Sequence, residues 1–201
     1  MLFRSLVPFP KSVTLEAGRF SFKKPLTFEI SDGQGEMPAQ LLNAELQRAG
    51  LRGVRVSRLK SAVPAFRMAA RKRSLILPFL PQQTASESYG LDIRADEIVC
   101  AARDPAGLFC GLQTLCQLIR ANCQGDTLPC LKIRDWPSLR WRCFQDDLTR
   151  GPSSTLDTLK FEASLASYLK LNLMTYYMEY QFAFKKHPEI EIGRASCRER
   201  V

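Results

Sequence analysis

A single adjacent pair of carboxyl side chains, Asp96–Glu97, is the first candidate for chemistry in this sequence of 201 residues. Carboxyl side chains are candidates for hydrolytic catalysis, because they can transfer protons as general acids and bases. The flanking residues 89–94 alternate apolar and polar side chains and continue into 97–101, which predicts a β-hairpin with one buried face. The pair falls on the turn of that hairpin. We therefore interpret it as a solvated turn and not as a catalytic pair.

Residues that bind metals are few and scattered. His187 is the only histidine, and we interpret it as an exposed loop residue. The seven cysteines show no Cys-x-x-Cys spacing and no grouping with the histidine, so no metal site and no cofactor is predicted. Cys110 and Cys116 fall inside a helical apolar pattern, which favours reduced thiols that act as small hydrophobes. The cysteines are at positions 100, 110, 116, 123, 130, 143 and 197.

The formal net charge of +9 suggests a second class of function, because excess Lys and Arg can bind nucleic acid or another anionic surface. The densest basic cluster is Arg67, Arg71, Lys72 and Arg73. No aromatic residues interleave with it, and it falls between two β-like segments, which favours a solvated loop. A basic, non-enzymatic binding module nevertheless stays open as the alternative function. Salt-sensitive binding to a nucleic acid would favour it.

Strand-like and helical patterns mix over the first 136 residues. One helix is predicted over 37–48, where Gly50 ends it. A second begins with Asp104 as its cap and Pro105 as its first residue, and Gly107 and Gly111 leave room for close packing on a sheet. Strands are predicted at residues 12–15, 19–22, 26–30, 54–56, 75–77, 89–94, 97–101 and 128–134. Together these elements predict an α+β domain, a sheet with two helices, over residues 1–136.

After the break at Trp136–Pro137 the order becomes strand, helix, strand. The predicted strands cover 141–146 and 171–177, and the helix between them runs to about 169. This is one βαβ unit, the building block of parallel α/β folds that include the (β/α)8 barrel, and it is assigned to residues 137–191. Glu179 follows the second strand, at the end where barrels place their sites. Contact with a substrate and a salt bridge to a further loop are both open for it.

The last ten residues, 192–201, resemble the translation of a common sequencing adapter. They are therefore treated as a non-native tail and left out of the fold. Without their three Arg and one Glu, the net charge falls from +9 to +7.

Two blocks of sequence resemble family 20 of the glycoside hydrolases, the β-N-acetylhexosaminidase type. In the first, residues 107–118 (GLFCGLQTLCQL) are similar to a helix motif of that family's N-terminal domain, and residues 129–137 (PCLKIRDWP) are similar to its exit. In the second, residues 141–152 (WRCFQDDLTRGP) are similar to the first barrel strand, with Cys143 where the family usually has Gly. The resemblance implies an α+β N-terminal domain followed by the truncated start of a (β/α)8 TIM barrel.

The resemblance also implies an activity. Family 20 enzymes remove terminal N-acetylglucosamine or N-acetylgalactosamine with retention, using the substrate's own acetamido oxygen as the nucleophile. A neighbouring Asp-Glu pair after barrel strand four assists them. We expect this chain to lack that pair, to contain no catalytic residue and to be inactive alone. The expected partners of the full-length enzyme are glycans with these terminal sugars, with no nucleic acid and no membrane involved.

Three further residues take their expected roles from the resemblance. Arg142 matches the arginine that binds sugar hydroxyls, and a guanidinium group suits paired hydroxyls because its donors lie in one fixed plane. A structural pair of Arg142 with Asp146 or Asp147 is the alternative. Asp147 and Arg150 are interpreted as an ion pair at the strand end.

The beginning of the sequence bears on location. Residues 1–8 carry one positive charge with no long apolar stretch behind it, which is unlike a secretory signal. No run of about 18 apolar residues follows anywhere, so no membrane span is predicted. A cytoplasmic location is favoured unless the N-terminus is incomplete.

Overall fold

A computed structural model of the protein describes residues 6–71, 77–78, 85–149, 154–178 and 184–188. The chain divides into two compact units, Met1–Ser138 and Leu139–Val201. None of the described helices combines the length and the apolar composition that crossing a bilayer requires.

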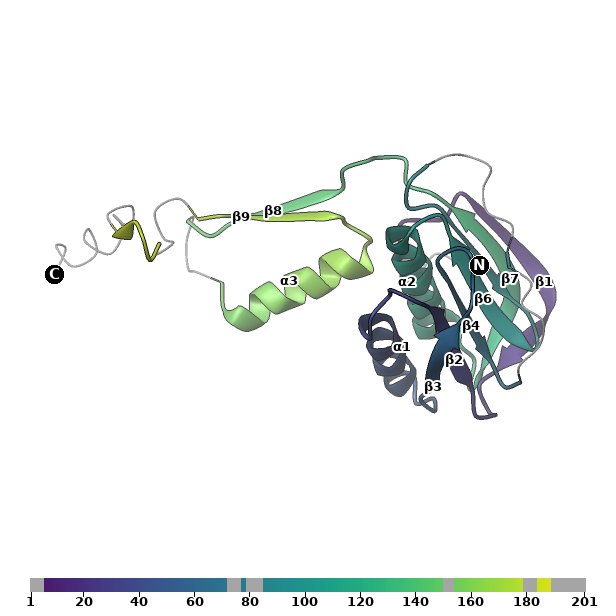
Figure 1. Ribbon diagram of the computed structural model, residues 1–201. Coiled ribbons are helices and arrows are strands. Elements are labelled where there is room, and N and C mark those ends of the chain that lie inside the picture. The colour runs from purple at the N-terminus through teal and green to yellow at the C-terminus, as the bar shows by residue number, and fades with distance from the viewer. Residues whose placement is uncertain (1–5, 72–76, 79–84, 150–153, 179–183, 189–201) are drawn as a thin grey trace. The chain divides into compact units, whose positions relative to one another are not determined.

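The first unit is built on a seven-stranded sheet within the described residues, and two helices cover one of its faces (Figure 1). The strand order is β1-β7-β5-β6-β4-β2-β3, in which only β2 and β3 run parallel. The elements are β1 (Ser12–Ser21), β2 (Thr27–Ser31), α1 (Met37–Arg48), β3 (Arg55–Leu59), β4 (Ala65–Ala69), β5 (Tyr89–Ile93), β6 (Glu97–Ala102), α2 (Pro105–Asn122) and β7 (Thr127–Asp135). This confirms the predicted α+β fold.

Three strands differ from the prediction. The segments 12–15 and 19–22 form one strand, β1, whose register against β7 shifts between Leu15 and Arg19. Gly18 lies in this shift with φ +102°, which glycine adopts without strain. Strand β4 is absent from the predicted set, because Arg67 interrupts a short apolar run. The strand predicted at 75–77 lies mostly outside the described residues, and Leu77 belongs to no strand.

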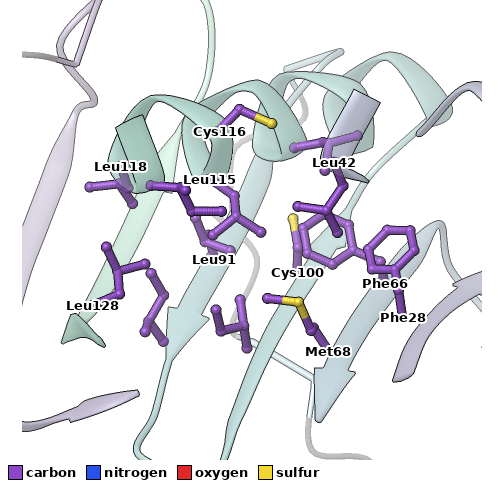
Figure 2. Close-up of a cluster of buried hydrophobic side chains, with 14 of the residues drawn as sticks. Phe28, Leu42, Phe66, Met68, Leu91, Cys100, Leu115, Cys116, Leu118 and Leu128 are labelled. Atoms are coloured by element: carbon purple, nitrogen blue, oxygen red, sulfur yellow. The ribbon is translucent and has the colours of Figure 1, made fainter. Parts of the chain in front are cut away.

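The hydrophobic core lies between the sheet and the two helices (Figure 2). Successive side chains of a strand point to opposite faces, so alternate residues of the central strands face the helices. The sheet contributes Phe28, Ile30, Phe66, Met68, Leu91, Ile93, Ile98 and Cys100, and the helices contribute Leu42, Leu46, Leu112 and Leu115, all at most 2% exposed. Burial of each large apolar side chain contributes about 1.5–3 kcal/mol, which makes this core the main source of stability.

Helix α2 begins as the sequence predicts and packs closely on the sheet. The Asp104 carboxylate accepts a hydrogen bond from the N–H of Gly107 at 2.7 Å, and Pro105 is the first helical residue. A Cβ atom on Gly107 would lie 2.7 Å from the carbonyl oxygen of Ser88. The glycine therefore permits the close approach of α2 to the segment before β5.

The opposite face of the sheet carries buried ion pairs, and this corrects two predictions. Arg67 is not part of a solvated loop: it lies in β4, is 4% exposed, and donates from Nε to Oε2 of Glu29 on β2 at 2.6 Å. The hairpin of β5 and β6 is buried on both faces rather than on one. On its second face, Asp92 accepts hydrogen bonds from Arg134 at 2.7 Å and from Arg94 at 3.1 Å.

Tyr89 joins three elements of the first unit. Its hydroxyl lies 2.6 Å from Oγ1 of Thr114 on α2 and donates to Oδ2 of Asp135 at the end of β7, at 3.0 Å. The other oxygen of Asp135 accepts a hydrogen bond from the backbone N–H of Lys11 at 3.2 Å. Burial raises the pKa of Tyr89 well above its ordinary value, with the Asp135 carboxylate adding to the effect.

We expect Tyr89→Phe to lower the free energy of unfolding by about 1–2 kcal/mol at pH 7, because Thr114 and Asp135 lose a buried partner. The unfolded tyrosine ionises near pH 10, while the folded one stays neutral, so unfolding releases a proton above that pH. The stability of the parent protein therefore falls as the pH rises past 10, and Tyr89→Phe lacks this part of the loss. Urea titrations of both proteins at pH 7 and 10.5 measure it. The same pH dependence in both would contradict the assignment.

The second unit contains β8 (Cys143–Asp147), α3 (Leu156–Tyr168) and β9 (Leu173–Tyr177). Strands β8 and β9 are parallel, so the predicted strand, helix, strand order forms a βαβ unit. Thr155 caps α3 by accepting a hydrogen bond from the N–H of Thr158 at 3.2 Å. On α3, Ala166 is buried and Leu156 is exposed. The predicted tail, residues 192–201, lies outside the described residues.

Candidate functional site

Arg142 lies immediately before β8 and is half-buried. Its guanidinium group donates from Nε to the carbonyl oxygen of Lys170 at 2.8 Å and from Nη1 to that of Leu139 at 2.9 Å. Its backbone N–H donates to Oδ1 of Asn172 at 2.9 Å. These bonds tie the residues before β8 to the turn between α3 and β9. The described geometry thus gives Arg142 a positioning role.

Asn172 completes this connection, and the sequence analysis did not single it out. Its Nδ2 donates to the carbonyl oxygen of Arg140 at 2.8 Å, so one amide side chain bonds to the backbone on both sides of Trp141. Lys170, two residues earlier, adopts φ +59° and closes the end of α3. The signal that the sequence offers is an Asn at the beginning of the predicted strand 171–177, since its amide can both donate to and accept from backbone groups.

The carboxyl ends of β8 and β9 lie at one edge, because the strands are parallel and Asp147 is in register with Tyr177. Ligands of parallel α/β folds bind at this edge. Oδ1 of Asp147 accepts hydrogen bonds from the N–H of Thr149 at 2.9 Å and from its hydroxyl at 2.5 Å, so Asp147 holds the turn after β8. Its predicted partner Arg150 and the candidate Glu179 both lie outside the described residues.

The structure does not place the backbone of Arg142 at this edge. Arg142 precedes β8 and Asp147 ends it, and a strand of five residues spans about 16 Å. Tyr176 lies near the carboxyl ends, and its hydroxyl donates to the carbonyl oxygen of Leu159 on α3 at 3.5 Å. The pKa of Tyr176 is raised by desolvation and by the neighbouring Glu162 carboxylate. The hydroxyl of Tyr176 therefore connects β9 to α3.

The Asp96–Glu97 pair has the wrong surroundings for a catalytic pair. Asp96 is exposed on the turn, as predicted, whereas Glu97 begins β6 and is 8% exposed. Glu97 accepts a hydrogen bond from Nη1 of Arg94 at 2.7 Å. The solvated-turn interpretation is therefore right for Asp96 and wrong for Glu97, whose carboxylate belongs to the ion pairs of the sheet.

The thiols of the first unit are mostly buried. Cys110 and Cys116 lie in α2, as the helical apolar pattern predicts, and Cys100 on β6 is also buried. Burial raises the pKa of Cys116 to about 12, which keeps it protonated at neutral pH. Among the described residues, no three side chains of His, Cys, Asp or Glu come together as a metal site would need.

Comparison with known protein families identifies the family of this chain. The model of glycosyl hydrolase family 20, domain 2, matches residues 4–136, more than half of the chain. The chain belongs to glycosyl hydrolase family 20. It is therefore related to hydrolases by family, and the matched residues are those of the seven-stranded sheet and its two helices.

Solved structures share the fold of this family 20 chain. The β-N-acetylhexosaminidase of Bacteroides fragilis NCTC 9343 matches with a TM-score of 0.67 and 21% identity, over 91% of this chain and 35% of that one. The N-acetyl-β-hexosaminidase of Streptomyces plicatus matches with 0.66 and 21%, over 88% and 35%. The exo-β-N-acetylglucosaminidase of Vibrio harveyi, in complex with N-acetylglucosamine, matches with 0.64 and 20%, over 87% and 25%.

The family 20 chain thus spans between a quarter and about a third of the length of these three enzymes. No curated protein sequence matches it.

Proposed function

We propose that this chain is part of a retaining exo-β-N-acetylhexosaminidase that removes terminal N-acetylglucosamine or N-acetylgalactosamine by substrate-assisted catalysis. Residues 1–136 would supply domain 2 of the enzyme, and residues 137–191 would supply the first βαβ of a (β/α)8 barrel. The observation that carries the proposal is a parallel βαβ unit directly after a family 20 domain 2.

Two further observations support the barrel. The match to the Bacteroides fragilis enzyme covers 91% of this chain, which is more than residues 4–136 amount to, so it extends into the second unit. The second unit also exposes large apolar side chains that would suit further barrel elements: Leu156 and Phe161 on α3, and Phe144 and Leu173 on the strands. Adjacent helices and strands of a barrel would bury such side chains.

We expect the chain by itself to release no nitrophenol from 4-nitrophenyl N-acetyl-β-D-glucosaminide above a buffer blank. The reason is that its only adjacent Asp-Glu pair, Asp96–Glu97, has one carboxylate in the sheet and paired with Arg94. A spectrophotometric assay with an active family 20 hexosaminidase as the positive control measures this. Turnover that disappears in Asp96→Asn/Glu97→Gln would refute the expectation and make that pair catalytic.

Arg142 and Glu179 are the proposed sugar-binding residues of the full-length enzyme. The sequence motif supports this role for Arg142, whereas its observed bonds to Lys170 and Leu139 support the positioning role. For Arg142→Lys in the full-length enzyme, we expect the KM to rise about tenfold or more through loss of a charged hydrogen bond to the sugar. The melting temperature should also fall, because one ammonium group cannot replace both backbone contacts. A lowered melting temperature with an unchanged KM would leave only the positioning role.

The structure weakens the alternative hypothesis of a basic binding module, because one residue of the basic cluster is not exposed. Arg67 is buried and paired with Glu29, so it does not contribute to an exposed basic cluster. The described residues therefore favour the hydrolase hypothesis.

A further inference from the structure

Strand β3 forms one edge of the sheet, and among the described strands none pairs with its outer side. The N–H of Arg55 donates to the carbonyl oxygen of Leu26 at 3.0 Å, so Arg55, Ser57 and Leu59 direct their backbone groups toward β2. Those of Val56 and Arg58 therefore point away from the sheet. Such an edge is a template for a further strand.

A groove of about 650 Å³ runs beside this edge, between β3 and α1. Val56 and Arg58 line it from the strand, and Ala39 and Ala44 line it from the helix. Val56 is 54% exposed and presents an apolar surface to the groove. Asn43 of α1 accepts a hydrogen bond from the N–H of Val54 at 2.8 Å and holds the helix beside the strand. A strand added to β3 would direct every second side chain into this groove.

The charge of the edge limits what can occupy it. Residues 52–60 contain Arg52, Arg55, Arg58 and Lys60 and no Asp or Glu. Asp32 lies 3.8 Å from Arg58 and Glu36 lines the groove, so these two carboxylates offset part of the charge, and the four cations still leave the edge net positive. A second copy pairing through its own β3 would bring twice this number of cations together. A nucleic acid would match the charge but cannot supply the backbone groups that an added strand needs.

We propose that β3 and its groove bind an extended acidic segment of a partner protein, which pairs with β3 as an additional strand and places an apolar side chain between Val56 and α1. The backbone of the segment bonds to Val56 and Arg58, and its carboxylates face the basic residues of the edge.

The probe is a fluorescein-labelled peptide, Asp-Glu-Val-Glu-Val-Asp-Glu, titrated with the full chain at physiological salt. We expect saturable binding, and none for the peptide in which Lys replaces every acidic residue. Arg55→Glu should weaken binding about tenfold. Arg103→Glu makes the same charge change at an exposed position away from β3 and should leave binding nearly unchanged.

Amide hydrogen exchange by NMR separates strand addition from simple charge attraction. With the peptide bound, the amides of Val56 and Arg58 should become protected, while those of Arg55 and Ser57 are protected already by β2. Binding without this protection would overturn the proposal. So would displacement of the peptide by a single-stranded RNA of equal charge that binds more tightly, or a peptide-independent dimer that protects the same two amides.

Discussion

Arg67→Met is expected to lower the free energy of unfolding by about 3–5 kcal/mol, since it leaves the Glu29 carboxylate buried without its main cation. Both side chains are almost fully buried, on neighbouring strands and in register. The guanidinium group contacts the carboxylate through Nε and Nη2. In water each charge would be fully solvated, so the sheet tolerates the pair only while each ion satisfies the other.

The double variant Glu29→Leu/Arg67→Met should recover most of the lost stability, because it removes both charges and keeps the volume apolar. The pair Glu16 and Lys132 is the matched control: its Nζ and Oε1 lie 2.8 Å apart on β1 and β7, but both side chains are about half-exposed. Lys132→Met should cost less than about 1 kcal/mol. Guanidinium chloride unfolding of the four proteins measures these values. Equal losses for Arg67→Met and Lys132→Met would show that burial does not set the cost.

Local signals predict the helices of the first unit well. The predicted helix over 37–48 is α1 with the same bounds, because Pro38 near its start and Gly50 after its end act within a turn of the helix. The cap of α2 by Asp104 is predicted for the same reason. Each of these features depends on contacts between residues close in sequence, which the order of residue types records directly.

Features that depend on distant residues are missed. The sequence around Arg67 indicates a buried strand only if the partner of its charge is known. That partner, Glu29, lies 38 positions earlier. Arg142 is predicted to bind sugar hydroxyls or to pair with Asp146 or Asp147, whereas the structure shows its Nε bonded to the carbonyl oxygen of Lys170, 28 positions later. Residue types do not encode a backbone acceptor, so no pattern could predict this bond. The family motifs, in contrast, depend on residue types and carried the assignment.

Gly111→Ala is expected to destabilise the protein by about 2–3 kcal/mol, although alanine favours a helix over glycine by about 1 kcal/mol. A Cβ atom at this position would lie 2.5 Å from Sγ of Cys100 and 3.1 Å from the ring of Tyr89. Both neighbours are at most 1% exposed, and a cysteine has only one side-chain torsion with which to move its sulfur. The added methyl group must therefore push α2 away from β5 and β6, across the core that both strands share with the helix.

Cys100→Ala tests this cause directly, because it removes the sulfur that the new methyl group would meet. In the double variant Gly111→Ala/Cys100→Ala, the volume gained on the helix is close to that lost on the strand. Its stability should therefore exceed that of Gly111→Ala, despite a second large-to-small change. Ala121→Gly, at an exposed position of the same helix, measures the helix-propensity contribution alone. Additive losses for Gly111→Ala and Cys100→Ala would mean that the methyl group does not meet the sulfur, and that the close approach of α2 to the sheet does not depend on glycine at 111.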